Sequence, residues 1–570
     1  MEEIQKKAPQ IDPITMEVIG NYLLSIAEEI GIALIKAAFS PNIKERRDCS
    51  AALLDNTGKT IAQAAHIPMH LGSIFGAGEA LLRKYRGEGI DDGDVFIGND
   101  GYYSGGTHLP DITLITPLFY GRRLVAFAGN IGHHLDVGGR TPGSTAADNK
   151  SIYEEGIRIP PVKLVKRGVL QRDLLDLITV NCRDPVERRA DIEVQIAANE
   201  IGKQRIRNLF EKYGTETILN VYNALYGYSE KRIRSAIKEL RDGEYEFTTV
   251  LDDDGSGKEA NIHVVCAVEH DRLTIDFSGS SKQSEGAVNV TRTALLSTVY
   301  YAIKSLLDPG IPQNYGFQRW IKIITEPGSI VDPGPTAAIS CRTDTCQKIA
   351  SALFGSLMQA MPAGRVIAGS NDNVSTIIFS GHDDRRNKDF VHLETVGGGS
   401  GARSTKDGLD GVQVHITNTS NLPVESLEVE YPLLVEKYAF VQDSGGPGKY
   451  RGGLALQRDI RILKDGTTFC AKADTFRNPP WGIFGGKQGS LLKILLNPGS
   501  ENEANLSSKG YQYRLGKGDL VSVKTPGAGG FGDPRERDPK FILEDLGNGK
   551  ISLKEAIDSY EFNPKNGGRR

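Results

Sequence analysis

Cysteine is scarce in this chain, and basic residues show no excess. The 570 residues include six cysteines without regular spacing, which argues against a disulfide framework and against a paired zinc knuckle. Lys and Arg number 68 against 72 Asp and Glu, so the net charge of -4 lacks the basic excess typical of nucleic-acid binding. These absences predict a protein of a reducing compartment without a nucleic-acid partner.

Long apolar segments are also missing. Residues 1–10 carry charges but no apolar signal-peptide core, and no uninterrupted apolar run reaches the roughly eighteen residues that span a bilayer. We therefore expect a cytoplasmic protein with no membrane partner.

Glycine, in contrast, is abundant. Its 65 residues predict many tight turns, and a hydrophobic share of 39% is enough for sizeable cores. At this length about three domains are expected. The patterns predict a mixed, multidomain α+β fold: a helical and β-hairpin N-terminal region (1–243), a central α+β domain (244–411) and a β-rich C-terminal domain (412–570).

Individual elements follow from the same patterns. Asp12 followed by Pro13 is typical of a helix start, and this helix is expected to end near Phe39. Ser73 is the expected cap of a helix that reaches about Tyr85. Further helices are expected at 191–212, 215–240, 294–307 and 345–361, and at the C-terminus behind a capping box of Ser552 and Glu555. Strands are expected at 50–54, 60–63, 245–281, 415–421, 427–441, 452–463, 467–474, 491–497 and 519–527.

The stretch Gly98–Gly139 holds three of the ten histidines and contains a predicted β-hairpin. Residues 112–119 are apolar and β-branched, Tyr120, Gly121 and Arg122 form a turn, and residues 124–128 return. A hairpin brings its outer ends together. The polar motifs at the two ends, THLPD and GHHLD, are therefore expected to be neighbours in space.

These motifs suggest a divalent metal site formed by His108, Asp111 and His133. Two imidazoles with a carboxylate suit Zn, Mn, Fe or Co, whereas Mg and Ca prefer oxygen alone. The alternative is that His108 caps a turn and His133 makes a local hydrogen bond. His134 and Asp136 alternate in direction with His133 in an extended strand, so they are candidates for orienting a ligating imidazole.

Other candidate motifs are weaker. His66 and His70 flank a proline that breaks helical spacing, so a pocket-lining or structural role is expected for both. Cys49, Cys341 and Cys346 are expected to be buried, inert thiols. The GAGGFG motif at 527–532 matches a dinucleotide-binding pattern, but Asp-Pro follows at once and no helix opens there. The motifs GPGK and GSGK lack the remaining residues of a P-loop, so this chain is not expected to bind ATP through a known loop.

Several motifs in order resemble the hydantoinase B, 5-oxoprolinase and acetone carboxylase large-subunit family. They are DPITMEVIG, GNDGYYSGGTHLPDITLITPLF, GHHLDVGG with PGS, EGIRIPPVKL, DSGGPGKYRGG and TPGAGGFGDP, and they extend from Asp12 to Pro534. The resemblance implies a subunit that works with a hydantoinase A-type nucleotide-binding partner, which holds ATP and Mg, in a heterotetramer or larger complex. It implies one divalent transition metal, Zn or Mn first and Fe or Co as alternatives. The implied ligands are Asp48, His108, Asp111 and His133, and the expected catalytic residues are His108, Asp111, His133 and His134.

The resemblance also implies a reaction. We expect an ATP-dependent amidohydrolase that opens cyclic amides of the N-methylhydantoin, 5-oxoproline or lactam type and is active only with its partner subunit. The partner would phosphorylate the substrate, and a water bound by the metal would attack the activated carbonyl. One alternative is the large subunit of an ATP-dependent ketone carboxylase, although such subunits carry substantial extra sequence. A second alternative is a noncatalytic scaffold for the ATP-binding subunit.

Overall fold

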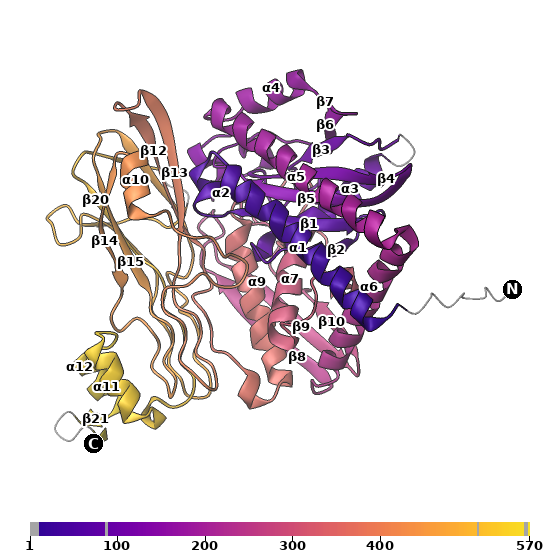
Figure 1. The fold of residues 1–570 in the computed structure, drawn as a ribbon. Helices are drawn as coiled ribbons and strands as arrows, with labels where there is room; N and C mark the ends of the chain where they lie inside the picture. The colour runs from indigo at the N-terminus through magenta and orange to yellow at the C-terminus, as the bar shows by residue number, and fades with distance from the viewer. Residues whose placement is uncertain (1–10, 86–88, 510–511, 564–567, 570) are drawn as a thin grey trace.

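The first part of the chain builds a seven-stranded antiparallel sheet, shown in indigo to magenta in Figure 1. The computed structural model describes residues 11–85, 89–509, 512–563 and 568–569. In the order β2-β1-β5-β4-β3-β6-β7, the strands are β2 (Thr60–Gln63), β1 (Cys49–Asp55), β5 (Arg123–His133), β4 (Asp111–Tyr120), β3 (Val95–Gly98), β6 (Val162–Lys166) and β7 (Val169–Leu170). The predicted hairpin is the β4–β5 pair at the centre of this sheet.

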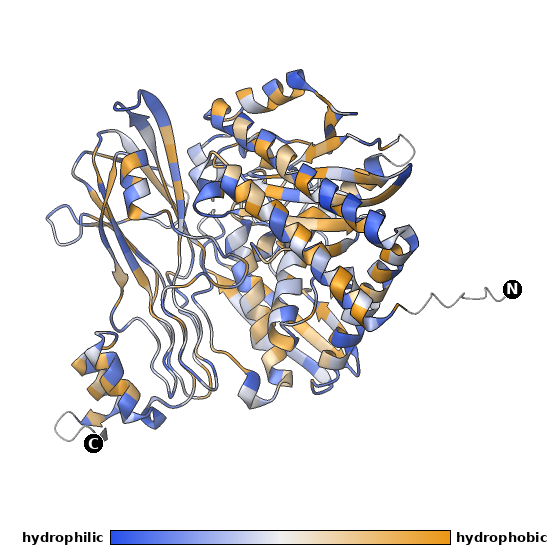
Figure 2. Cartoon of the chain, viewed as in Figure 1, coloured by the Kyte–Doolittle hydropathy of each residue, from blue (hydrophilic) through white to orange (hydrophobic). Residues whose placement is uncertain are grey.

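Helices cover both faces of this sheet. They are α1 (Pro13–Ala37), α2 (Pro41–Lys44), α3 (Leu71–Lys84), α4 (Arg172–Val180), α5 (Pro185–Tyr213) and α6 (Thr215–Ile237). Successive residues of a strand point to opposite faces. Accordingly, Leu53 packs in the core shared with α1 and α5, while Leu54 packs in the core beneath α3. Figure 2 shows hydrophobic strands beneath these helices and hydrophilic residues along the helices' outer sides.

The first helix begins as predicted, because the Asp12 carboxylate accepts from the Ile14 and Thr15 backbone N–H groups. By length and composition α1 is apolar enough to cross a membrane, a property that buried core helices share. The search for uninterrupted apolar runs therefore did not reveal that this predicted helix is apolar enough to span a membrane. In the structure its buried residues pack against α5, α6 and β1.

The middle of the chain forms a smaller sheet with one long helix against it and a second long helix packed on the first. The strands, in the order β11-β10-β9-β8, are β11 (Ile321–Ile324), β10 (Arg272–Asp276), β9 (Ala260–Glu269) and β8 (Gly243–Leu251). The helices are α7 (Arg292–Leu307), α8 (Tyr315–Gln318) and α9 (Arg342–Leu357). Helix α9 packs on β8 and β9, and its first residues point toward the β4–β5 hairpin through Arg342.

The C-terminal part contains two sheets around one core. The first has the order β13-β12-β16-β19: β13 (Lys388–Val396), β12 (Ser375–Asp383), β16 (Thr467–Lys472) and β19 (Tyr513–Leu515). The second has the order β14-β15-β20-β17-β18: β14 (Leu433–Phe440), β15 (Leu456–Ile462), β20 (Leu520–Lys524), β17 (Lys493–Leu496) and β18 (Ala504–Asn505). Because β12 pairs with β13 on one side and with β16 on the other, one sheet contains strands from both sides of the expected boundary at residue 411. Beyond the sheets lie α11 (Pro539–Gly547), α12 (Leu553–Tyr560), whose N-terminus Ser552 caps, and the pair β21 (Phe562–Asn563) and β22 (Gly568–Arg569).

Three local predictions were wrong. Ser73 does not cap α3, since the 3₁₀ turn Pro68–His70 leads directly into that helix. Residues 427–430 belong to a helix, α10 (Val424–Glu430), and the strand begins only after Pro432. Residues 415–421 form no strand, because His415 has a left-handed backbone with φ 54°.

Glycine-rich segments lie side by side beneath the C-terminal sheets, as the long loops of Figure 1 show. Their backbones touch directly. A Cβ atom on Gly527 would lie 1.8 Å from the Ser444 carbonyl oxygen, and one on Gly529 would lie 1.9 Å from that of Trp481. Only glycine allows this approach. The GAGGFG motif is thus explained by backbone packing, and it is followed by the short 3₁₀ turn Pro534–Glu536.

Candidate metal centre

The β4–β5 hairpin brings the predicted polar motifs together. Asp111 begins β4, His133 ends β5, and the two are direct partners in the antiparallel register. His108 lies in the turn just before Asp111, whose backbone N–H donates to the His108 carbonyl. One ligand atom from each of His108, Asp111 and His133 lies within 4.8 Å of the other two, and all three residues are buried. A hairpin end therefore places two imidazoles and one carboxylate at a common point.

One oxygen of the Asp111 carboxylate accepts two hydrogen bonds, and the other oxygen accepts none. Its Oδ2 atom accepts from the Thr107 hydroxyl at 2.5 Å and from Arg342 at 3.0 Å. Its Oδ1 atom has no hydrogen bond and faces His108 Nε2 at 3.2 Å. Burial acts to raise the pKa of this carboxyl, but the adjacent His108 and His70 hold it well below its usual range. Asp111 is therefore ionised at neutral pH.

The two imidazoles are kept neutral by burial. Desolvation, with Arg342 next, lowers the pKa of His108 to about 4, and burial lowers that of His133 well below its ordinary value. Neither nitrogen of the His108 ring has a hydrogen-bond partner. A neutral imidazole has a lone pair for a cation, and unpartnered buried polar atoms are rare in proteins. The residues present thus fit a divalent transition metal with mixed nitrogen and oxygen ligands.

Asp48 and His70 lie next to the trio and line a small cavity together with His108 and His133. His70 Nε2 is 3.4 Å from Asp111 Oδ1 and 3.9 Å from Asp48 Oδ1, so this ring lies between the two carboxylates. Ser50 Oγ contacts the other ring nitrogen of His70 at 3.0 Å. Burial raises the pKa of Asp48, whose backbone carbonyl accepts from the His133 N–H. Asp48 is outside the trio that converges within 4.8 Å, and its assignment as a ligand stays a prediction.

His134 points away from the trio. Its Nε2 atom lies 3.0 Å from Gln195 Oε1 on α5, and burial lowers its pKa to about 4. Asp136 accepts from the backbone N–H groups of Gly138, Gly143 and Arg183 and pairs with the Arg183 side chain. Its contacts therefore hold the loop after β5 and include no ligating imidazole among the described residues.

The remaining motifs lie elsewhere. His66 lines a second cavity of about 860 Å³ beside α1, which shares Ile67 with the wall of the site. All six cysteines are free and buried. Burial raises the pKa of the Cys341 thiol to about 12 and that of Cys346 to about 11, so both remain protonated and unreactive at neutral pH.

The cavity at the trio has a volume of about 60 Å³ and is formed by three parts of the chain. The first part supplies Asp48, His70, His108 and His133, α9 supplies Arg342 and Thr343, and the C-terminal sheet supplies Thr376, Leu393, Thr395 and Lys472. Sequence reasoning missed Thr107, although this residue begins the THLPD motif and lies four positions before Asp111. It also missed Arg342 and Lys472, because they come to the site only through tertiary packing and have no spacing pattern of their own. His70 was considered, and its place on the cavity agrees with a pocket-lining role.

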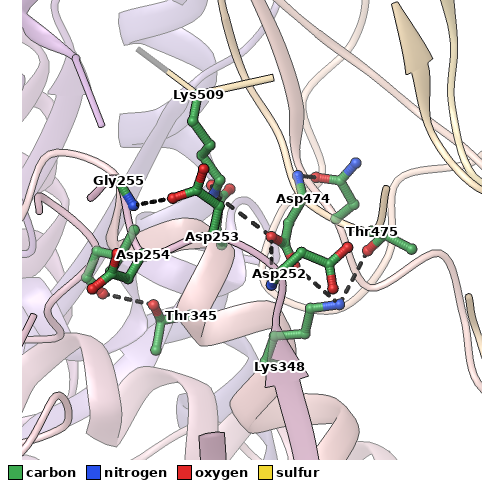
Figure 3. A network of polar contacts seen from close by, with 12 residues as sticks. Asp252, Asp253, Asp254, Gly255, Thr345, Lys348, Asp474, Thr475 and Lys509 are labelled. Carbon is green, nitrogen blue, oxygen red and sulfur yellow. Dashed lines mark hydrogen bonds and ion pairs between the residues drawn. The ribbon is translucent and has the colours of Figure 1, made fainter. Parts of the chain in front are cut away.

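A network of buried ion pairs lies behind α9 (Figure 3). Lys348 lies 3.2 Å from the Asp474 carboxylate, which also approaches Lys509 at 3.8 Å and accepts from the Asp252 backbone N–H. Lys509 pairs in addition with Asp344 in the first turn of α9. These pairs connect α9 to the C-terminal sheet and so fix the position of Arg342.

Comparison with known proteins identifies the family. The hydantoinase B/oxoprolinase family matches residues 12–534. The chain belongs to this family. The caprolactamase subunit beta of Pseudomonas jessenii is 30% identical over 563 residues, which cover 96% of each protein. The crystal structure of the ATP-dependent caprolactamase from that organism matches with a TM-score of 0.90 and 28% identity, over 97% of this chain and 96% of that chain.

A more distant structural match is the nucleotide-free structure of acetone carboxylase. It has a TM-score of 0.88 at 20% identity and covers 97% of this chain and 80% of that chain. This match shows a shared fold. The hydantoinase B/oxoprolinase family thus contains ATP-dependent enzymes that act on cyclic amides, and the name of the caprolactamase relative as a subunit implies a partner chain.

Proposed function

We propose that this hydantoinase B-type chain is the metal-containing subunit of an ATP-dependent cyclic-amide hydrolase. The observation that carries the proposal is the meeting of His108, Asp111 and His133, with unpartnered atoms on His108 and Asp111, in a chain that superposes on an ATP-dependent caprolactamase along nearly its whole length. Three potential metal ligands in a buried cavity are suited to hydrolysis of an activated carbonyl, because a metal bound there would activate water.

ATP is needed because the carbonyl of an unstrained amide is a poor electrophile. Phosphorylation of the carbonyl oxygen by the partner subunit would create a better one. A divalent metal at the trio would lower the pKa of a water molecule and polarise the carbonyl. Thr107 and Arg342 orient the Asp111 carboxylate toward this point. His70 Nε2, between Asp48 and Asp111, can carry a proton between the cavity and Asp48.

The partner subunit would supply the nucleotide site. The glycines of 527–532 are occupied by backbone packing, as shown by Gly527 and Gly529, and no long helix follows them. We therefore assign ATP and Mg to a hydantoinase A-type partner in a heterotetramer or larger cytoplasmic complex.

The test is reconstitution with that partner. The purified complex should release ADP, phosphate and the ring-opened amino acid in equal amounts from at least one member of a panel that contains hydantoins, 5-oxoproline and caprolactam. Metal analysis of this chain alone should give one Zn or Mn, or Fe or Co, per chain. His108→Ala should remove both the metal and the turnover.

Three other results would reject the proposal. Carboxylation of a ketone with bicarbonate, in place of ring opening, would identify a ketone carboxylase. Full activity in His108→Ala would identify a scaffold. Hydrolysis by this chain without partner and ATP would contradict the assigned division of labour.

A further inference from the structure

Three cationic side chains line the cavity beside the metal trio. Arg46, Arg342 and Lys472 are 2%, 2% and 5% exposed. Burial of a charge without compensation is costly, so each buried cation needs an anionic or polar partner. Among the residues of the cavity wall, only Asp48 supplies a carboxylate, and Asp111 reaches the wall through its contact with Arg342. Positive charge is therefore in excess even before a metal is added.

All three cations have donors without partners, but Arg342 and Lys472 have more of them than Arg46 has. Arg342 uses Nη2 on Asp111 and Thr107, while its Nε and Nη1 atoms are buried without hydrogen bonds. Lys472 Nζ donates to Thr343 Oγ1 at 2.9 Å, and within the described chain no carboxylate lies within the 4.0 Å of an ion pair. An ammonium group has three N–H donors, so Lys472 has donors to spare.

The neighbouring cations are better satisfied, since Arg46 leaves only its Nε atom without a partner and Lys509 is paired with a carboxylate. Arg46 donates to the Leu393 carbonyl and to Thr395, contacts that hold it to β13. Lys509, which pairs with Lys472 in a backbone bridge, has its charge matched by Asp344. The positive charge that lacks a full set of partners is thus mainly that of Arg342 and Lys472, which line the same cavity.

We propose that Arg342 and Lys472 bind the phosphoryl group of the activated substrate beside the metal trio. The inference rests on the proposed function and names the part of the substrate that binds to Arg342 and Lys472 in the cavity wall. A cavity of about 60 Å³ holds a group the size of one tetrahedral oxyanion, since a water molecule occupies about 30 Å³ in the liquid. Guanidinium and ammonium donors suit phosphate oxygens, and the N-terminus of α9, which supplies Arg342 and Thr343, adds a favourable dipole.

This placement has a chemical consequence. A phosphoryl group held by Arg342 and Lys472 would put the carbon that bears it next to His108, Asp111 and His133. Water would add to that carbon, and cleavage of the ring C–N bond, with a proton from the added water passing to the nitrogen, would leave an acyl phosphate. A second water would then displace phosphate, and the same donors would stabilise the negative charge on the phosphate as its bond to the carbon breaks. Lys472 is therefore a substrate-binding residue whose contribution depends on the phosphoryl group.

The experiment uses the full chain after removal of metal with a chelator. Inorganic phosphate is titrated into wild type, Lys472→Met, Lys472→Arg and the surface control Lys493→Met, with heat of binding as the readout. We expect phosphate binding in wild type, a loss of about 10- to 100-fold in Lys472→Met, recovery in Lys472→Arg and no change in Lys493→Met. Unchanged affinity in a folded Lys472→Met, or no phosphate binding by wild type, overturns the inference.

A second measurement does not depend on the variants' folding. Crystals of the wild-type chain soaked in tungstate, a heavy tetrahedral analogue of phosphate, should show an anomalous peak within hydrogen-bond distance of Arg342 and Lys472. A peak only at other positions overturns the inference. Bicarbonate is titrated in parallel, and binding of bicarbonate without phosphate also overturns it, in favour of a carboxylate-sized ligand.

The outcome is separable from that of the proposed function. Phosphate binding that depends on Lys472, with no cyclic amide opened by the complex, supports the anion site and rejects the hydrolase. Cyclic-amide hydrolysis whose kcat and KM are the same in Lys472→Met and wild type supports the hydrolase and rejects the anion site.

Discussion

Replacement of Asp111 by asparagine tests the site most directly. The change keeps the shape of the side chain and an acceptor for Thr107, but it removes the charge that faces Arg342 at 3.0 Å. The two side chains are 0% and 2% exposed, so the guanidinium would be left as an uncompensated buried cation. Loss of one partner of a buried pair costs about 3–5 kcal/mol. We expect Asp111→Asn to lower local stability by that amount in the metal-free chain.

The assay is native-state hydrogen exchange of the amides in β4 and β5, with chelator present. Protection should fall by about two to four orders of magnitude, since about 3–5 kcal/mol is lost and about 1.4 kcal/mol corresponds to a factor of ten. The double variant Asp111→Leu with Arg342→Met removes both charges and should recover most of this protection. Protection within tenfold of wild type in Asp111→Asn, or a double variant as unstable as the single one, would refute the reasoning from charge burial. Added Zn should protect wild type and leave Asp111→Asn unchanged, because the carboxylate ligand is gone.

Three further outcomes are expected. His70→Asn should weaken metal binding by about 10- to 100-fold, whereas His134→Asn should keep the metal and lose only stability, as measured by metal titration and thermal melting. Burial lowers the pKa of His108 from 6.5 to about 4 in the metal-free chain. As the pH falls across that interval, the unfolded chain takes up the proton before the folded chain does, so the free energy of unfolding should decrease. The urea midpoint should therefore fall less steeply between pH 6.5 and 4 in His108→Asn than in wild type, and parallel curves would count against the shift. Lys509→Met should destabilise by about 3–5 kcal/mol, while the double variant with Asp344→Asn should recover part of the loss, as a denaturation cycle would show.

The hairpin and the meeting of His108, Asp111 and His133 could be predicted because their signals are local. Alternation along residues 112–119 and the turn at Gly121 determine the pairing, and the register then places Asp111 opposite His133. The helix start at Asp12 was predictable for the same reason, since capping depends on neighbours in the sequence. The mixed α+β class followed from the same periodicities.

The rest of the site depends on packing between distant segments. Arg342 reaches Asp111 across 231 positions, and Lys472 reaches Thr343 across 129, contacts for which a single sequence carries no pattern. The strand expected at 415–421 failed because His415 adopts a left-handed backbone, a conformation that alternation of side chains does not reveal. His134 followed the period of an extended strand, and that alternation turned its ring toward Gln195.

The construction of the cavity from three remote segments has a consequence for biosynthesis. A chain that has left the ribosome only as far as α7 already contains the whole trio, but it lacks both Arg342 and the wall that β13 and β16 supply. Until α9 has been made, the Arg342 guanidinium that donates to Asp111 is missing. Synthesis must pass residue 472 before every segment that lines the pocket is present.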